Sequence, residues 1–466
     1  MDTEFEAMTA REQAEGIRTR QFSARELLDA HLARIAEVNP AINAVVTLDE
    51  EGARAAATAA DERTMAGGPL GPLHGVPMTH KDTHDTAGMR TTFGSPLHRD
   101  RVPAGDSLVI ARLKAAGVIT TGKTNVPEFA AGSHTFNPVF GTTVNPYDPS
   151  KSAGGSSGGT AAAIAARIQP AGDGSDMGGS VRTPAAFCNL AGLRPSAGRI
   201  PAEEPYSWLG RAGVLARRTS DVAYVMACVS GPDRCDPAAL PEPGSLFDVA
   251  LRENLTGVRI GWTPGFGLAV PVEPEVLDVL AGVLPVFERL GATVEEACPD
   301  LRDADEVFST TRAFDLALKY GDLLPEHRGE IKDSLVWNLE KGLALTVEDL
   351  MSATRARRRL HTAVTGFFGR YDLLIAPATQ VLPFPAELEY PRAVGGTEFD
   401  TYLGWMRAAT LVSATGLPAL SVPAGFSGGL PVGLQIVGAH GADLDLLHAA
   451  NAFELATGFA ATAPPS

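Results

Sequence analysis

Two short segments rich in glycine and serine constrain this 466-residue chain more than any other feature. The first, residues 154–159, reads GGSSGG and runs directly into the apolar, helix-forming sequence TAAAIAA. The second reads DMGGS and ends at Ser180. Glycines beside a serine let the backbone approach a ligand closely and turn its N–H groups towards that ligand. The pattern therefore predicts serine nucleophile chemistry next to a buried helix and argues against a flexible linker.

Lys81 lies in a context that predicts a buried base. It follows the mostly apolar segment PLHGVPM, residues 72–78, which predicts a strand leading to a buried turn. A serine hydroxyl is a weak nucleophile near neutral pH, so it must pass its proton to a base. Burial lowers the pKa of a lysine because the charged form loses its hydration. Ser180 is thus the candidate nucleophile, and neutral Lys81 is the candidate base.

The GGSSGG segment admits two other interpretations. A phosphate-binding P-loop would continue with lysine, whereas this segment continues with threonine and alanine. The segment also fits the G-x-S-x-G nucleophile elbow of α/β-hydrolases. An esterase of that type would use Ser156 as nucleophile with a later histidine, for which His440 and His448 are candidates. That alternative stays open, although it leaves Lys81 and the turn before Ser180 without a role.

A metal site is not expected. His80 and His84 are four residues apart, but Lys81 stands where a zinc protease carries glutamate, and the residues that follow disfavour a helix. These histidines are interpreted as polar wall or turn residues. No sequence feature calls for a cofactor.

Composition and charge narrow the function classes. A net charge of −16 argues against binding to nucleic acid, since phosphate would repel that surface. The sequence contains no run of 18 apolar residues and no secretory signal at its acidic start. Its four cysteines lack C-x-x-C spacing. We therefore expect a soluble, cytoplasmic protein that does not enter a membrane.

Helix and strand patterns alternate along the chain, which indicates an α/β fold. A capping box at Ser23 and Glu26 predicts a helix that ends near residues 39–40. Further patterns predict helices at 107–116 and 275–290 and strands at 258–262 and 291–294. Residues 300–370 are expected to be mainly helical, with one buried face formed by Phe308, Phe314, Leu318 and Tyr320.

Residues 71–200 resemble the core of the amidase signature family. The similarity rests on GPLHGVPMTHKD, KTNVPEFAAGS, AGGSSGGTAAAIAA and GSDMGGSVRTPAAFCNLAGLRPS, and it continues more weakly to the carboxyl end. The resemblance implies a large twisted mixed β-sheet covered on both faces by helices. It also implies a single domain over 1–466, with the catalytic core at about 71–200 and a pocket-shaping helical insert at about 300–370.

The resemblance further implies roles for individual residues. Ser180 matches the nucleophile, Ser156 matches a serine held by a cis peptide bond, and Lys81 matches the base. The oxyanion hole is expected from the N–H groups of Met177, Gly178, Gly179 and Ser180. The substrate pocket is expected to include Asn125, Phe129, Phe136 and His84.

The implied activity is hydrolysis of the C–N bond of small or aryl-bearing amides through a seryl acyl-enzyme, with water as the second substrate. Carbamate (urethane) or ester cleavage would use the same chemistry. The alternative within the family is the amidase component of a tRNA-dependent amidotransferase. The expected ligands are small amides or carbamates, and the resemblance allows a homodimer.

Overall fold

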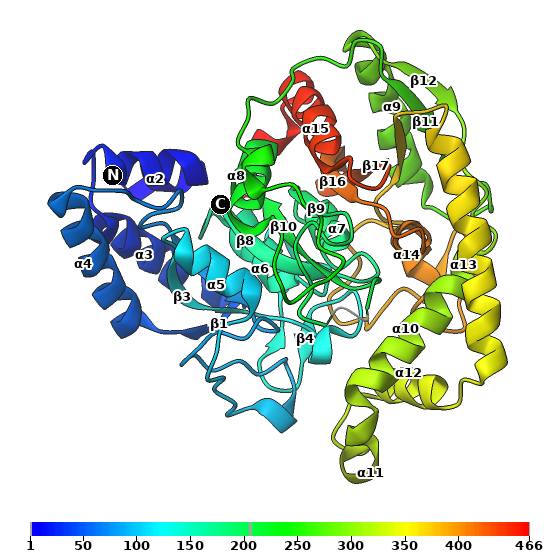
Figure 1. Cartoon of the computed structure of the whole chain (residues 1–466), viewed down its shortest axis with the longest axis horizontal. Coiled ribbons are helices and arrows are strands. Elements are labelled where there is room, and N and C mark those ends of the chain that lie inside the picture. The colour runs from blue at the N-terminus through cyan, green and yellow to red at the C-terminus, as the bar shows by residue number, and fades with distance from the viewer. Residues whose placement is uncertain (1, 205–206, 466) are drawn as a thin grey trace.

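The amino-terminal part of the chain is helical and leads into a small sheet (Figure 1). The structure, a computed structural model, describes residues 2–204 and 207–465. The first helices are α1 (Asp2–Ala7), α2 (Ala10–Arg18), α3 (Ala24–Ile42) and α4 (Glu50–Ala66). The predicted capping box of Ser23 and Glu26 is confirmed at α3, which continues through Pro40 to Ile42, beyond its predicted end.

The small sheet carries one of the candidate site residues. Its strands are β1 (Val45–Leu48), β3 (Ile119–Thr124) and β2 (Pro77–Lys81), in that spatial order. β2 runs parallel to β3, and β1 runs antiparallel to it. The predicted helix at 107–116 is confirmed as α5 (Leu108–Ala115), which precedes β3. Lys81 is therefore the last residue of a strand and not part of the turn after it.

Eight of the described strands form the large sheet. In spatial order they are β12 (Thr293–Glu296), β11 (Arg259–Trp262), β13 (Leu373–Pro377), β17 (Leu430–Gly438), β16 (Ala419–Ser427), β9 (Ala191–Arg194), β10 (Arg211–Ala216) and β8 (Ala171–Asp176). β11 is parallel to both of its neighbours, and the other pairs are antiparallel. The predicted mixed sheet is confirmed, as are the strands near 258–262 and 291–294.

Both faces of this sheet are buried because the side chains alternate between two cores. In β13, Leu373 and Ile375 belong to the core on one face, whereas Leu374 and Ala376 belong to the core on the other. This alternation follows the two-residue period of a strand. A strand that is apolar at every position is expected where helices cover both faces of a sheet.

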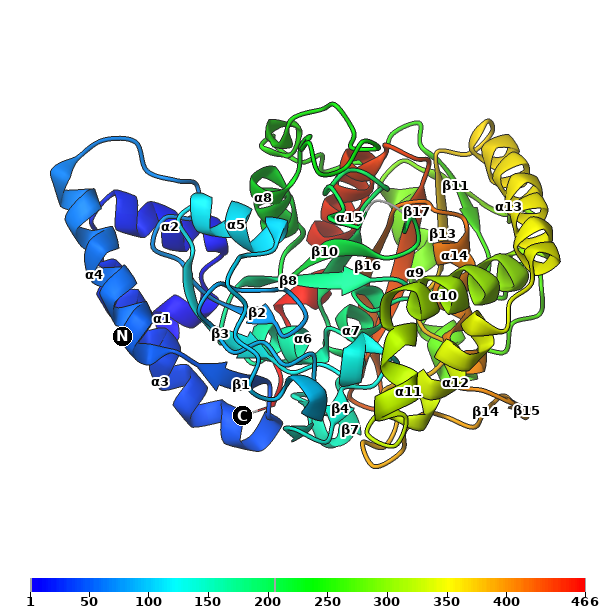
Figure 2. The same ribbon diagram turned by 60° about the horizontal axis from the view of Figure 1, so that its bottom comes forward.

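The covering helices divide between the two faces (Figure 2). α8 (Thr219–Val229), α9 (Pro274–Arg289) and α15 (Asp443–Thr457) contribute to the first core. The opposite face is covered by α6 (Gly158–Ala165), α7 (Arg182–Phe187), α13 (Val347–Phe368) and α14 (Arg407–Ala414). Short pairs of strands complete the fold: β4 (Phe136–Asn137) with β5 (Gly141–Thr142), β6 (Val144–Asn145) with β7 (Asp148–Ser152), and β14 (Ala393–Val394) with β15 (Thr397–Glu398). Within the described residues, no helix combines the length and the apolar character needed to cross a bilayer.

Residues 304–368 are mainly helical and lie at the edge of the molecule opposite the amino-terminal helices (Figure 1). They form α10 (Ala304–Tyr320), α11 (Leu324–His327), α12 (Asp333–Leu343) and α13. The predicted buried face of α10 was partly wrong: Phe308 is buried, but Phe314 and Leu318 are 39% and 55% exposed. A helix advances about 100° per residue, so these two positions face a different side from Phe308.

Candidate active site

Lys81 projects from the end of a fully buried strand. All five residues of β2 are buried, and Lys81 itself has no exposed surface. Its backbone is paired with Thr124 of β3, and its N–H donates a hydrogen bond to Asp173 Oδ2 at 3.0 Å. The sheet and this carboxylate together fix the point from which the amine extends.

Three serine hydroxyls surround the Lys81 amine. Its Nζ atom lies 2.7 Å from Ser156 Oγ, 2.9 Å from Ser157 Oγ and 2.8 Å from Ser175 Oγ. Ser156 and Ser157 precede α6, and the peptide bond between Gly155 and Ser156 is cis. Ser175 lies near the end of β8. Hydroxyls can accept from a charged amine or donate to a neutral one, so this arrangement accommodates either protonation state.

The environment of Lys81 favours the neutral amine. Burial lowers the pKa of Lys81 to about 7, although Asp176 and Asp173 act in the opposite direction. Removing an ammonium group from water disfavours its charged form, and the serine hydroxyls offer it only neutral partners. Near neutral pH, the uncharged form is therefore far more favoured for Lys81 than for a solvent-exposed lysine.

A close backbone contact fixes the start of α6 against β3. A Cβ atom on Gly159 would lie 2.3 Å from the backbone N and 2.5 Å from the backbone O of Asn125, so only glycine fits there. The hydroxyls of Thr124 and Thr160 add a contact of 2.8 Å between the two elements. The glycines of the GGSSGG segment thus let Ser156 and Ser157 reach the lysine on the neighbouring strand.

Ser180 lies between β8 and α7, beside the other serines. The N–H of Ser157 donates to the carbonyl oxygen of Ser180 at 3.1 Å, which ties the two loops together. Ser156 and Ser180 line the same cavity. Lys81 contacts the hydroxyls of Ser156, Ser157 and Ser175, but not that of Ser180. Within the described residues, Ser180 Oγ has no hydrogen-bond partner, so the hydrogen-bonded path from Lys81 does not reach it.

The loop before Ser180 contains backbone N–H groups without an acceptor in the described part of the chain. Met177, Gly178 and Ser180 all line the cavity, and their N–H groups have no acceptor within the described part of the chain. The N–H of Gly179 differs from the expectation, because it donates to Asp176 Oδ1 at 2.8 Å. Gly179 has a φ of +108°, a conformation that a side chain would strain. Three N–H groups in this loop are therefore available to a negatively charged oxygen.

Asp176 holds this loop in place by accepting hydrogen bonds from its backbone N–H groups. Its Oδ2 atom accepts from Val181 N at 3.1 Å, and its Oδ1 atom lies 3.0 Å from Arg182 and 3.5 Å from Arg194. Burial alone would raise the pKa of Asp176, but the two arginines hold it well below its usual value. The loop is thus held by a buried, fully ionised carboxylate.

A second buried carboxylate, Asp173, joins Lys81 to two histidines. His80 Nδ1 lies 2.6 Å from Asp173 Oδ1, and His84 Nδ1 lies 2.7 Å from Asp173 Oδ2. Burial would raise the pKa of Asp173, but His80 and His84 lower it well below the usual value. Both histidines therefore direct one ring nitrogen towards this carboxylate.

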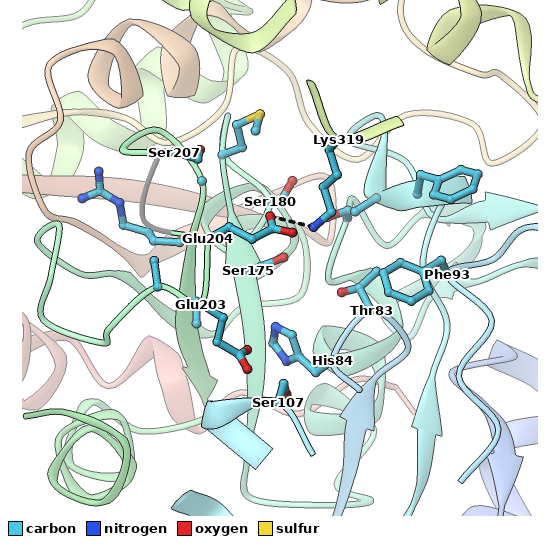
Figure 3. Close-up of a pocket in the computed structure, with 18 of the residues that line it drawn as sticks. Thr83, His84, Phe93, Ser107, Ser175, Ser180, Glu203, Glu204, Ser207 and Lys319 are labelled. Carbon is cyan, nitrogen blue, oxygen red and sulfur yellow. Dashed lines mark hydrogen bonds and ion pairs between the residues drawn. The ribbon is translucent and has the colours of Figure 1, made fainter. Parts of the chain in front are cut away.

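A cavity of about 770 Å³ lies beside these groups and is lined by Ser156, Ser175, Ser180 and His84 (Figure 3). Figure 3 shows Ser175, Ser180 and His84 around the cavity, together with Lys319 of α10, which forms an ion pair with Glu204 at 2.9 Å. Among the predicted pocket residues, His84 and Phe129 line this cavity. Buried serines, a lysine of lowered pKa and free backbone N–H groups beside one cavity are the parts that acyl transfer requires.

Comparison with known proteins agrees with this geometry. The family model described as Amidase matches residues 26–447. The chain belongs to the amidase family. An acylamidase of Rhodococcus erythropolis is 36% identical to it, over 96% of this chain and 95% of that protein. A glutamyl-tRNA(Gln) amidotransferase subunit of Methylococcus capsulatus is 33% identical, over 96% of this chain and 97% of that protein.

Solved structures give the same result. A bacterial aryl acylamidase of the amidase signature enzymes superposes on this amidase with a TM-score of 0.92 and 32% identity, covering 97% of each chain. The resemblance inferred from the sequence motifs is thereby confirmed. This amidase is a hydrolase that acts on carbon–nitrogen bonds other than peptide bonds.

Two residues expected in the pocket of this amidase lie elsewhere. Asn125 is buried behind the site, where its side chain donates to Gly141 O at 3.1 Å and to Thr143 Oγ1 at 3.0 Å. Phe136 packs against the His134 ring, with Lys332 Nζ 4.9 Å from its centre. Neither residue lines the cavity. The side chains of both contact neighbouring loops instead.

The histidines proposed for a nucleophile elbow also lie elsewhere. His440 contacts the carbonyl oxygen of Ala197 at 3.2 Å, and His448 accepts from Arg252 N at 3.1 Å. Neither lines the cavity with Ser156, whose basic neighbour is Lys81. The geometry therefore gives the elbow interpretation no support.

The sequence interpretation missed the two carboxylates, although Asp176 lies inside a quoted motif and Asp173 directly precedes that motif. Asp173 and Asp176 belong to β8, whose sequence AGDGSD is buried at all but one position. An acidic residue in a buried strand requires polar partners, and that requirement was the available signal. It does not reveal which distant residues supply the partners.

Proposed function

We propose that this amidase hydrolyses small or aryl-bearing amides through an acyl-enzyme on Ser180, with Lys81 as general base and Ser156 as proton relay. The observation that carries the proposal is the 2.7 Å contact between Lys81 Nζ and Ser156 Oγ in a fully buried setting. The lowered pKa of Lys81, about 7, supports its role as a base near neutral pH.

In the proposed reaction, Ser180 Oγ attacks the amide carbonyl carbon while its proton passes to Ser156, whose own proton passes to neutral Lys81. The negative charge that develops on the carbonyl oxygen is received by the N–H groups of Met177, Gly178 and Ser180. The same path then runs in reverse, and a proton reaches the departing nitrogen as the C–N bond breaks. Water next hydrolyses the ester on Ser180 by the same relay.

The relay requires Ser180 Oγ to approach Ser156 Oγ when substrate binds. Catalytic hydrogen bonds in ligand-free enzymes are often long and tighten only in the complex with substrate. The N–H groups of this loop would hold the carbonyl oxygen of the substrate and place its carbon beside Ser180 Oγ. Rotation of the Ser180 side chain would then bring its hydroxyl to Ser156 Oγ. The position of both serines on one cavity supports this movement.

The substrate class follows from the similarity to the acylamidase and the aryl acylamidase. Carbamates and esters carry a carbonyl of the same geometry, so we propose them as further substrates. A cytoplasmic location and assembly as a homodimer stay predictions from the sequence, and gel filtration of the purified chain tests the second.

Turnover by the purified chain alone tests the proposal against its main alternative. We expect acetanilide and 4-nitroacetanilide to be hydrolysed without any added protein, with release of the aniline measured by absorbance. The amidotransferase component similar to this chain suggests the alternative, in which a partner protein is needed. No turnover of anilides, aliphatic amides or carbamates by the folded chain would contradict the proposal.

A further inference from the structure

Arg312 is a buried cation without an anionic partner. It lies in the middle of α10, lines the cavity that holds Ser180, and is only 5% exposed. Its guanidinium donates to the Tyr402 hydroxyl at 2.7 Å and contacts Met177 Sδ at 3.3 Å. Its Nε atom has no hydrogen-bond partner, and no carboxylate of the described residues lies within 4.0 Å of the group. A guanidinium has five N–H donors, so most of these stay unmatched.

Two other buried arginines, Arg182 and Arg211, make more hydrogen bonds than Arg312, although Arg211 Nε also lacks a partner. Arg182 forms an ion pair with Asp176 and also bonds three further oxygen atoms. Arg211 donates to three carbonyl oxygens. The partners of Arg312 are one phenol and one thioether sulfur, which is a weak acceptor.

The acidic residue closest along the helix does not compensate Arg312. Asp315 accepts a hydrogen bond from the Ser207 hydroxyl at 2.7 Å, on another part of the cavity wall. Burial raises the pKa of Asp315 to about 6, although Ser207 and Arg312 act in the opposite direction. A buried charge without a partner is unfavourable, because it has lost its hydration. Because Arg312 lies on the cavity wall, an anionic group of a bound ligand could reach it and supply the missing partner.

We propose that Arg312 is a specificity-determining residue that binds a carboxylate group of the substrate. A planar guanidinium matches a carboxylate through two parallel hydrogen bonds, which a carbonyl oxygen alone does not provide. The sulfur of Met177 is the contact that a carboxylate would replace. Because Met177 belongs to the loop that ends at Ser180, a carboxylate there lies close to the reacting carbonyl. The substrates are accordingly amides that carry a carboxylate on the acyl or the amine side, an inference that rests on the proposed function.

Matched pairs of amides test the proposal. Glutaryl-4-nitroanilide is compared with pentanoyl-4-nitroanilide for the acyl side, and 4-acetamidobenzoate with acetanilide for the amine side. We expect kcat/KM to favour the charged member of one pair by about tenfold to a hundredfold, as for a charge-assisted pair of hydrogen bonds. In Arg312→Met that preference should fall towards one, and Arg312→Lys should retain part of it. Arg302→Met, at a residue whose side chain is 77% exposed, is the control and should change neither rate.

Stability separates a binding role from a structural one. Methionine in place of an uncompensated buried charge should leave Tm unchanged or raise it, whereas loss of a structural arginine lowers it. Arg182→Met, which breaks a matched ion pair, should lower Tm clearly. An equal loss for both members of each pair in Arg312→Met, or no preference for charge in the wild type, would overturn the proposal.

Binding measured without turnover keeps this test independent of the proposed function. Calorimetry with glutarate should give a Kd at least about tenfold weaker for Arg312→Met than for the wild type. Hydrolysis of the neutral anilides tests the proposed function alone. Equal glutarate binding by both proteins would refute the role of Arg312, even in an active amidase.

Discussion

Replacing Lys81 with methionine is expected to lower kcat/KM for an anilide by about 10²–10⁴-fold, the range typical of a lost general base. Methionine fills a similar volume but cannot take a proton from Ser156. The surrounding hydroxyls of Ser157 and Ser175 are too weakly basic to replace the amine. Steady-state hydrolysis of 4-nitroacetanilide measures the loss, and circular dichroism with Tm checks that the variant is folded.

A second buried lysine provides a matched control. Lys123 lies on β3, where its Nζ atom contacts the carbonyl oxygen of His84 at 2.5 Å and Thr86 Oγ1 at 2.9 Å. Burial lowers its pKa to about 8, although Asp82 and Asp173 raise it. Lys123→Met should lose far less activity than Lys81→Met, because Lys123 does not contact the serines. Equal losses in the two variants would indicate that buried lysines act here only through stability.

The Ser180→Ala variant should lose activity by a factor on the order of 10⁶, since it removes the proposed nucleophile. That factor corresponds to roughly 8 kcal/mol of transition-state stabilisation. The variant should also resist covalent labelling by a sulfonyl fluoride. Mass spectrometry of peptides from the labelled wild type should place the adduct on Ser180.

Ser156→Ala separates the relay from a nucleophile. If Ser156 only carries a proton, this variant still forms the adduct on Ser180, at a much lower rate. Labelling that survives in Ser180→Ala but disappears in Ser156→Ala would reverse the two assignments. It would then favour the nucleophile elbow, despite the positions of His440 and His448.

The sequence predicts the parts of the site that lie in compact motifs. Glycines flank Ser156 and Ser180, and the apolar segment before Lys81 marks a buried strand, so local pattern indicates both the serines and the buried lysine. The contact between Lys81 and Ser156 joins a strand of the small sheet to the loop before α6. It was expected only from the family resemblance, since no local pattern specifies contacts between segments far apart in the chain.

The missed features depend on contacts that local patterns do not contain. Asp173 forms hydrogen bonds with His80 and His84, which lie 93 and 89 residues earlier in the chain. The orientation of α10 decides that Phe314 faces solvent while Arg312 faces the cavity. Asn125 was predicted to line the pocket because it lies in a motif of the family. Its side-chain amide instead donates hydrogen bonds to Gly141 and Thr143.

The pH dependence of kcat/KM for 4-nitroacetanilide, measured from pH 5 to 10, tests the central claim most directly. The base acts only when neutral, and the pKa of Lys81 is about 7. The rate should therefore rise about tenfold per pH unit below that value and level off above it. Lys123→Met and His84→Gln should keep this inflection, and Lys81→Met should lose it. A flat profile, or an inflection near pH 7 that persists in Lys81→Met, would contradict a neutral lysine as the base.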